Sequence, residues 1–290
     1  MIKIQNLSKT YRKSNVRALD NVSLTIGRGI FGLLGNNGAG KTTLMNILTT
    51  LVDFTQGEVY IKGIPLAPKN YMLLRKMIGY MPQEAGGYPN LSVRDTLDYF
   101  GILNGLTAGE RKNRVSELLN YLNLEKHADK KFKNLSGGMK RRLSLGIALI
   151  SDPEILIADE PTTGVDPSER IKMRNLLLKL GEDKTVILST HIIEDVSYTC
   201  EKLAILCEGK KKYEGDIEEL MERASEKIWE IEVKDEKRLK QILEGNLVAG
   251  IERGQGKSAV KIISSQKPYN DAVPAAPTLE DAYIAVERVW

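Results

Sequence analysis

The sequence predicts an α/β protein with a mostly parallel sheet, an antiparallel N-terminal β-subdomain, a helical insertion and a small α+β domain at its C-terminal end. Three features carry this prediction. Short apolar runs that end in glycine or polar residues recur, as in IFGLL before Gly35 and ILIA before Asp159. Runs in which apolar and polar residues alternate precede them, and the long segment from about 88 to 150 contains no strand pattern. Continuous apolar runs separated by helical segments are typical of parallel strands buried on both faces.

The expected elements follow in order along the chain. IKIQNL at 2–7 and VSLTI at 22–26 alternate apolar with polar residues, which indicates half-exposed antiparallel strands. Buried strands of the core are expected at IFGLL, IGYM, ILIA, VILST and LAILC. The segment from about 88 to 150 has no strand pattern but several helix starts, such as Ser92 before VRDTLDYFGIL. This segment is therefore expected to be a helical insertion.

The pattern changes after Gly215. EKIWEIEV, KRLKQILEG, LVAGIE and SAVKII indicate a β-α-β-β unit with a turn at RGQGK. Thr278, followed by Asp281 three residues later, fits a capping box that begins a last helix. We therefore expect a first, larger domain over residues 1–216 and an accessory α+β domain over residues 217–290.

Composition limits the classes of protein that fit. The 290 residues carry 42 basic and 38 acidic side chains, and the net charge of +4 gives no electrostatic case for nucleic-acid binding. Cys200 and Cys207 lack metal-ligand spacing and indicate free thiols in a reducing compartment. No apolar signal core or run of ~20 apolar residues occurs, so we expect a soluble, cytosolic chain.

A phosphate-binding loop stands between the predicted strand IFGLL and a helix. Its glycines let backbone N–H groups converge on phosphate oxygens, and the helix N-terminus adds partial positive charge. Lys41 is expected to reach the β and γ phosphates, and the Thr42 hydroxyl to bind Mg²⁺. The predicted nucleotide-binding residues of this segment are Gly35, Asn36, Asn37, Gly38, Ala39, Gly40, Lys41, Thr42 and Thr43.

Polar residues at the ends of three other strands predict the rest of a phosphate-cleaving site. Asp159 can join the Mg²⁺ shell, and Glu160 can accept a proton from the attacking water or orient it. His191 follows VILST and is expected to contact the γ phosphate. Gln83 follows IGYM and could reach Mg²⁺ or water, although a glutamine after a strand is usually only a loop residue.

A second glycine pair opens the helix that follows Ser136. Ser136 can cap this helix, and Gly137 and Gly138 stand where an anion could approach its N-terminus. One triphosphate can hardly use two such sites in one chain, because the phosphate-binding loop already surrounds it. We therefore predict that residues 136–138 serve a nucleotide held by another subunit.

Six segments, in the same order, resemble the ATP-binding subunit of an ABC transporter. GNNGAGKT resembles its Walker A, ILIADE its Walker B, LSGGM its signature, PQ at 82–83 its Q-loop, TGVDP its D-loop and STH its H-loop. The resemblance covers roughly residues 1–215. It implies a P-loop NTPase core that binds ATP and Mg²⁺.

The resemblance also implies partners. It places Tyr11 where an aromatic ring stacks on adenine. It implies a head-to-tail dimer, for which we expect a homodimer although a different partner cassette stays open, in which each ATP lies between one chain's Walker A and residues 136–138 of the other, with Asp166 reaching across. Gln83 and the helical insertion would contact transmembrane permease subunits. Through them the chain would associate with the cytoplasmic face of the cell membrane.

Two differences from the commoner motifs of the family indicate which branch of it the chain resembles. Met139 ends the signature where glutamine is commoner, and the D-loop reads GVDP. These features, with PTLEDAY near the C-terminus, resemble the drug-export and bacitracin-resistance branch, whose permeases are of the ABC-2 type. The expected function is therefore ATP hydrolysis that powers an exporter. Two alternatives stay open: a soluble ABC ATPase acting on ribosomes or nucleic acid, and an ATP-sensing interaction protein without turnover.

Overall fold

The computed structural model describes residues 1–12, 14–84, 86–254 and 257–289, and its contacts divide the chain into two compact units, residues 1–211 and 212–290. The first unit is built on a six-stranded sheet in the order β10-β9-β3-β8-β7-β6, whose strand β10 continues past residue 211 into the second unit. The pairs β9-β3, β3-β8, β8-β7 and β7-β6 are all parallel, which confirms the predicted sheet. The strands are β3 (Gly29–Leu34), β6 (Ile78–Met81), β7 (Ile155–Asp159), β8 (Thr185–Thr190), β9 (Lys202–Cys207) and β10 (Lys210–Asp216).

An antiparallel sheet accompanies this core, in the order β2-β1-β4-β5. The two predicted antiparallel strands are confirmed as β1 and β2, which pair with each other, and β4 joins the other edge of β1. Its strands are β1 (Ile2–Tyr11), β2 (Val16–Ile26), β4 (Gln56–Ile61) and β5 (Ile64–Pro65). The inward side chains of this sheet share one hydrophobic core with the first helix and with β7, through residues such as Ile4, Met45 and Ile157.

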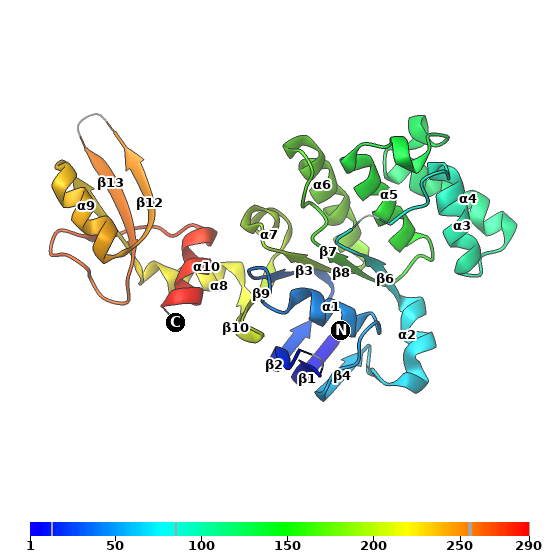
Figure 1. Ribbon diagram of the computed structural model, residues 1–290, viewed down its shortest axis with the longest axis horizontal. Helices are drawn as coiled ribbons and strands as arrows, with labels where there is room; N and C mark the ends of the chain where they lie inside the picture. The colour runs from blue at the N-terminus through cyan, green and yellow to red at the C-terminus, as the bar shows by residue number, and fades with distance from the viewer. Residues whose placement is uncertain (13, 85, 255–256, 290) are drawn as a thin grey trace. The chain divides into compact units, whose positions relative to one another are not determined.

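Helices cover both faces of the six-stranded sheet. Figure 1 shows α1 between this sheet and the antiparallel strands, while α6 and α7 lie on the opposite face. Because both faces are covered, every residue of β7 and β8 is buried. These helices are α1 (Lys41–Leu48), α2 (Tyr71–Met77), preceded by the 3₁₀ turn η1 (Pro68–Asn70), α6 (Pro167–Asp183) and α7 (Ile193–Thr199).

The predicted helical insertion is present between β6 and β7. Ser92 caps its first helix by accepting a hydrogen bond from the Asp95 N–H at 3.0 Å, and Ser136 caps its last by accepting from Met139 N–H at 3.3 Å. Both predicted helix starts are thus confirmed. The insertion contains α3 (Val93–Leu103), α4 (Ala108–Tyr121), η2 (Glu125–His127), η3 (Phe132–Asn134) and α5 (Gly137–Leu149).

The second unit has its own sheet, in the order β12-β13-β11-β14, and its own core. The predicted β-α-β-β unit is confirmed as β11, α9, β12 and β13; the RGQGK turn includes residues 255–256, outside the described residues. The predicted capping box is also present, because Thr278 Oγ1 accepts from the Asp281 N–H and the Asp281 carboxylate accepts from the Thr278 N–H. The elements are α8 (Ile217–Ser225), β11 (Ile228–Val233), α9 (Glu236–Gly245), β12 (Leu247–Arg253), β13 (Ser258–Ile263), β14 (Val273–Pro274) and α10 (Leu279–Arg288).

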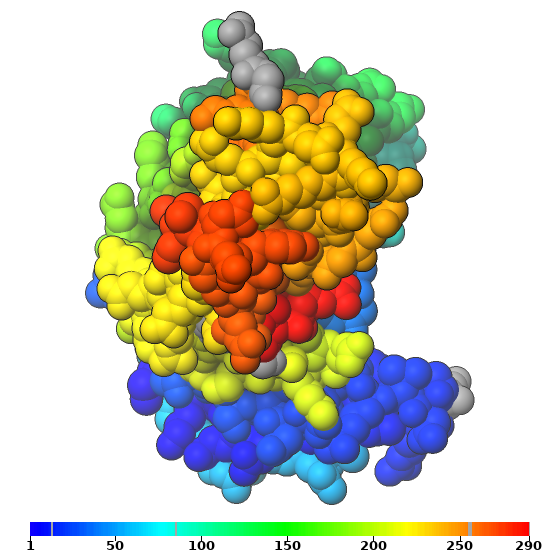
Figure 2. Space-filling model, turned by 90° about the vertical axis from the view of Figure 1, so that its left-hand side faces the viewer, coloured from blue at the N-terminus to red at the C-terminus, as the bar shows by residue number. Residues whose placement is uncertain are grey.

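Figure 2 shows one face of this second unit, where the segment after β13 lies across the surface between α9 (gold) and α10 (red). In neither unit does any helix of the described residues combine the length and the apolar content that a bilayer span requires.

Candidate functional site

The phosphate-binding loop joins the carboxyl end of β3 to α1. Gly40 has a φ of 103°, and a Cβ at this position would lie 2.5 Å from the carbonyl oxygen of Ala18, so only glycine fits. Lys41, 5% exposed, begins the helix. Its Nζ donates to the carbonyl oxygens of Gly35 at 2.6 Å and Asn36 at 3.2 Å. The loop therefore holds a buried cation beside a helix N-terminus, as a phosphate group requires.

Glu160 follows β7 and is 3% exposed. Its Oε2 accepts hydrogen bonds from His191 Nδ1 at 2.7 Å and Thr163 Oγ1 at 2.8 Å, and its Oε1 lies 3.5 Å from Lys41 Nζ. Burial acts to raise the pKa of Glu160, but the hydrogen bonds and the Lys41 charge outweigh it and hold the pKa below its ordinary value. The carboxylate is therefore ionised at neutral pH, the form that can accept a proton.

Asp159 is fully buried at the end of β7. The parallel register sets it beside Ser189 of β8, whose Oγ donates to Asp159 Oδ1 at 2.6 Å. Asp159 Oδ2 has no hydrogen-bond partner among the described residues. A buried carboxylate oxygen without a partner, at the sheet edge that carries the phosphate-binding loop, fits a hard cation such as Mg²⁺.

We predict that Ser189→Ala lowers the free energy of unfolding of the first unit by about 1–3 kcal/mol, because the buried Asp159 carboxylate loses its hydrogen-bond donor. Urea unfolding monitored by circular dichroism measures the change. Ser197→Ala, on the exposed surface of α7, is the matched control and should change stability by less than about 0.5 kcal/mol. Equal stability of the two variants would contradict the assigned hydrogen bond.

A cleft of about 580 Å³ brings together most of the residues that were predicted to bind ATP within one chain. Tyr11 reaches it from β1, where its hydroxyl lies 3.3 Å from Thr43 Oγ1. Ala39 belongs to the loop, but its side chain is buried in the core below. The predicted residues that line the cleft are Tyr11, Asn36, Asn37, Gly38, Gly40, Lys41, Thr42, Thr43, Gln83 and Glu160.

Comparison with known proteins shows which family the chain is similar to. The profile of the family described as ABC transporter matches residues 19–163, half of the chain. The linearmycin resistance ATP-binding protein LnrL of Bacillus subtilis is 37% identical over 212 residues, which are 72% of this chain and 67% of that protein. The chain belongs to the ABC transporter family. The predicted identity as an ATP-binding subunit of that family is confirmed.

Further comparisons agree with this assignment. The Nod factor export ATP-binding protein I of Paraburkholderia xenovorans is 38% identical over 216 residues, covering 74% of this chain and 70% of that protein. The dimeric post-hydrolysis structure of the ATP-binding cassette MJ0796 bound to ADP and Pi has a TM-score of 0.68 and 31% identity, covering 74% of this chain and 98% of that one. Some curated relatives are much longer, and the chain spans 12% of their length.

The signature turn (residues 136–138) and the D-loop (residues 163–167) are not among the residues that line this cleft. Ser136 and Gly137 are exposed at the start of α5, and Asp166 is exposed at the start of α6, where it accepts from the Glu169 N–H at 2.9 Å. Met139, the unusual signature residue, is 7% exposed. The difference from glutamine therefore lies in a buried side chain and not in the exposed residues Ser136 and Gly137.

Arg141 was not predicted as a site residue. From α5 it donates to the carbonyl oxygens of Gln83 and Thr163, the latter at 3.1 Å, and so joins the Q-loop to the segment after Glu160. Burial lowers the pKa of Arg141, while the charges of nearby carboxylates oppose that shift. No signal in the sequence marks this residue, because its partners are backbone atoms of distant segments.

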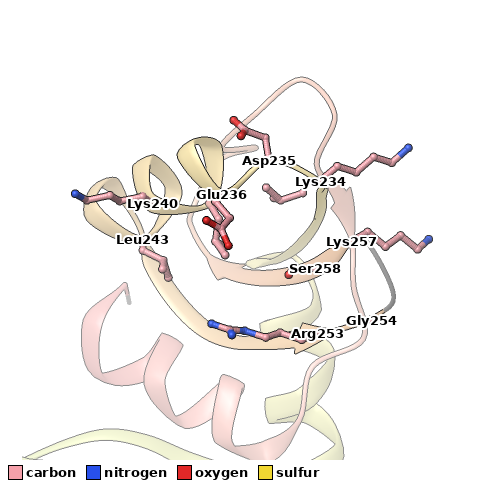
Figure 3. Close-up of a pocket in the computed structure, with 11 residues that line it drawn as sticks. Lys234, Asp235, Glu236, Lys240, Leu243, Arg253, Gly254, Lys257 and Ser258 are labelled. Carbon is pink, nitrogen blue, oxygen red and sulfur yellow. The ribbon is translucent and has the colours of Figure 1, made fainter.

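A second cavity, of about 500 Å³, lies in the C-terminal unit between the start of α9 and the β12-β13 hairpin (Figure 3). Its side chains do not converge on a ligand. Lys234, Lys240 and Lys257 point away from the cavity, while Glu236 points into it (Figure 3). Lys257 Nζ is also paired with Glu232 Oε1 at 2.6 Å. The cleft at the phosphate-binding loop is therefore the candidate functional site.

Proposed function

We propose that this cassette hydrolyses ATP and thereby powers an ABC-2 type exporter, by closing with a second copy of itself on ATP at the cytoplasmic face of the cell membrane. One observation carries the proposal. The phosphate-binding cleft, with Lys41 and Glu160, is separate from the exposed signature turn and Asp166 of the same chain. In the proposed arrangement, an ATP held in the cleft meets the second set of groups from another subunit.

The cleft supplies the cis half of the proposed site. The loop N–H groups and Lys41 would hold the phosphates of ATP, and Tyr11 would stack on the adenine. Thr42, Asp159 and Gln83 would hold Mg²⁺, which when bound neutralises charge on the phosphates. Glu160 would accept the proton of the attacking water. His191 donates to Glu160 and would contact the γ phosphate.

The signature turn and the D-loop supply the trans half. The first N–H groups of α5 have no partner within the helix, so they can donate to phosphate oxygens of a second chain. Ser136, Gly137 and Gly138 would make these contacts, and Asp166 would reach across the interface. Because ATP would join both subunits, it would bind the closed dimer better than the open one, and that difference in affinity drives closure. One chain carries both halves intact, which supports a homodimer.

The names of the relatives support an export function. They refer to linearmycin resistance and to Nod factor export. In the proposed complex, Gln83 and the helical insertion would contact the permease, so that dimer closure moves the transport pathway. The contacts of Glu160 with His191 and Lys41 favour hydrolysis over an ATP sensor without turnover.

We expect that the tagged chain, extracted with detergent from membranes of its own host, copurifies with a membrane protein of several spans and hydrolyses ATP. Mass spectrometry of the eluate and phosphate release measure the two outcomes. The Glu160→Gln chain is the control that should bring down the same protein without turnover. Sedimentation of the chain with ribosomes, without a membrane protein, would support the ribosomal alternative and contradict the exporter.

A further inference from the structure

One side chain joins the signature turn to the D-loop segment within the same chain. Glu169, in the first turn of α6, has a side chain that is 12% exposed. Its Oε2 accepts a hydrogen bond from Arg142 Nε of α5 at 3.1 Å, and its own N–H donates to Asp166 Oδ1 at 2.9 Å. Glu169 is therefore bonded both to the helix that follows the signature turn and to the cap that ends the D-loop.

The Arg142 side chain is also fixed by hydrogen bonds to the backbone. Its side chain is 9% exposed, and Nη1 donates to the carbonyl oxygens of Leu122 at 2.8 Å and Asn123 at 3.0 Å, at the end of α4. Removal of either member of a buried ion pair leaves an uncompensated charge, which is strongly unfavourable. The pair therefore restricts movement of α6 relative to the helical insertion.

The second signature glycine belongs to the same junction. A Cβ at Gly138 would collide with the carboxylate of Glu169, whereas the nearest described atom to a Cβ at Gly137 is the Gly164 carbonyl oxygen, at 3.9 Å. The carboxylate of Glu169 thus occupies the space that a side chain at position 138 would need. The backbone of the signature turn rests directly on the start of α6.

We propose that Glu169 is a positioning residue that holds the signature turn and the D-loop as one rigid block against the partner's nucleotide. This inference rests on the proposed dimer, since residues 136–138 and Asp166 would have to meet one ATP at the same time. Groups that meet one ligand must keep their relative positions closely, because small displacements cost much of the interaction. Glu169 itself would not touch the nucleotide.

The test measures dimerisation of the full chain in a Glu160→Gln background with ATP and Mg²⁺, by sedimentation velocity at several protein concentrations. Glu169→Ala is expected to raise the dimer dissociation constant by about tenfold or more. Lys172→Ala is the matched control, because Lys172 Nζ lies 2.7 Å from Glu169 Oε1 but its side chain is 54% exposed. It should change the constant by less than about twofold.

Two further measurements separate positioning from general damage. Binding of a fluorescent ATP analogue to the monomer should be unchanged in Glu169→Ala, because the cleft lies elsewhere. The double variant Arg142→Met/Glu169→Met removes both charges, so it should fold even if Glu169→Ala does not. Its dimer should be weaker than that of the Glu160→Gln parent, because it too lacks the Arg142–Glu169 pair. Dimerisation of both variants at the parental level, or loss of ATP binding by the folded double variant's monomer, would overturn the assignment. Absence of a dimer in the Glu160→Gln parent would instead overturn the proposed function on which it rests.

Discussion

Glu160→Gln is expected to reduce steady-state ATP hydrolysis by about 10²- to 10⁴-fold, because the amide keeps the shape of the side chain but cannot accept a proton from water. ATP binding should be retained, since the phosphate-binding loop and Lys41 are unchanged. Phosphate release under saturating ATP measures turnover. Size-exclusion chromatography with ATP should show the trapped dimer.

Glu154→Gln is the control for this prediction. Glu154 precedes β7, at the opposite end of the strand from Glu160, and its exposed side chain is paired with Lys62. Its replacement should leave turnover within about twofold, as is usual for an exposed ion pair. Turnover in Glu160→Gln that equals this control would sink the role assigned to Glu160.

Gly137→Asp is expected to weaken ATP-dependent dimerisation by at least about 100-fold, because its carboxylate would face the partner's γ phosphate and like charges in contact cost several kcal/mol. The monomer should tolerate the change. Gly137 is exposed, and an acidic residue at a helix N-terminus is favourable. Sedimentation in the Glu160→Gln background measures the dimer, and a fluorescent ATP analogue measures binding by the monomer.

Gly137→Asn separates charge from size in this experiment. Asparagine has nearly the same shape as aspartate without its charge, so it should weaken the dimer much less than Gly137→Asp does. Equal effects of the two variants would point to steric exclusion. Loss of ATP binding by the Gly137→Asp monomer would contradict the use of the signature turn by a second subunit.

Sequence patterning predicted the parallel core well and the antiparallel sheet only in part. Strands buried on both faces carry near-continuous apolar runs, so β7 and β8 stand out in the sequence. β4 escaped prediction because its first three residues, Gln56 to Glu58, are exposed and polar, and its pairing with β1 spans a long stretch of chain. Its place in the sheet depends on a distant partner, which no local pattern records.

The candidate site likewise contains residues that the sequence predicted and residues that only the structure identified. The phosphate-binding loop is contiguous, so its spacing of glycines, Lys41 and Thr42 carries the chemistry in the sequence itself. The sequence does not mark Ser189, because its hydroxyl gains significance only from the Asp159 carboxylate, which belongs to another strand. Thr163 lies three residues after Glu160 in the same turn, but only the structure shows that its hydroxyl donates to that carboxylate. Arg141 and Glu169 bond across segments in the same manner.

By itself, the sequence determined which residues form the phosphate-binding loop, which acidic residues end a buried strand, and that a second capped helix begins at Ser136. These properties depend on neighbouring residues along the chain. Only the tertiary structure decided that His191 and Lys41 contact Glu160, that Ser189 orients Asp159, and that Glu169 ties the signature turn to the D-loop. Those contacts depend on strand order and helix packing, which arise from burial of apolar surface across the whole unit.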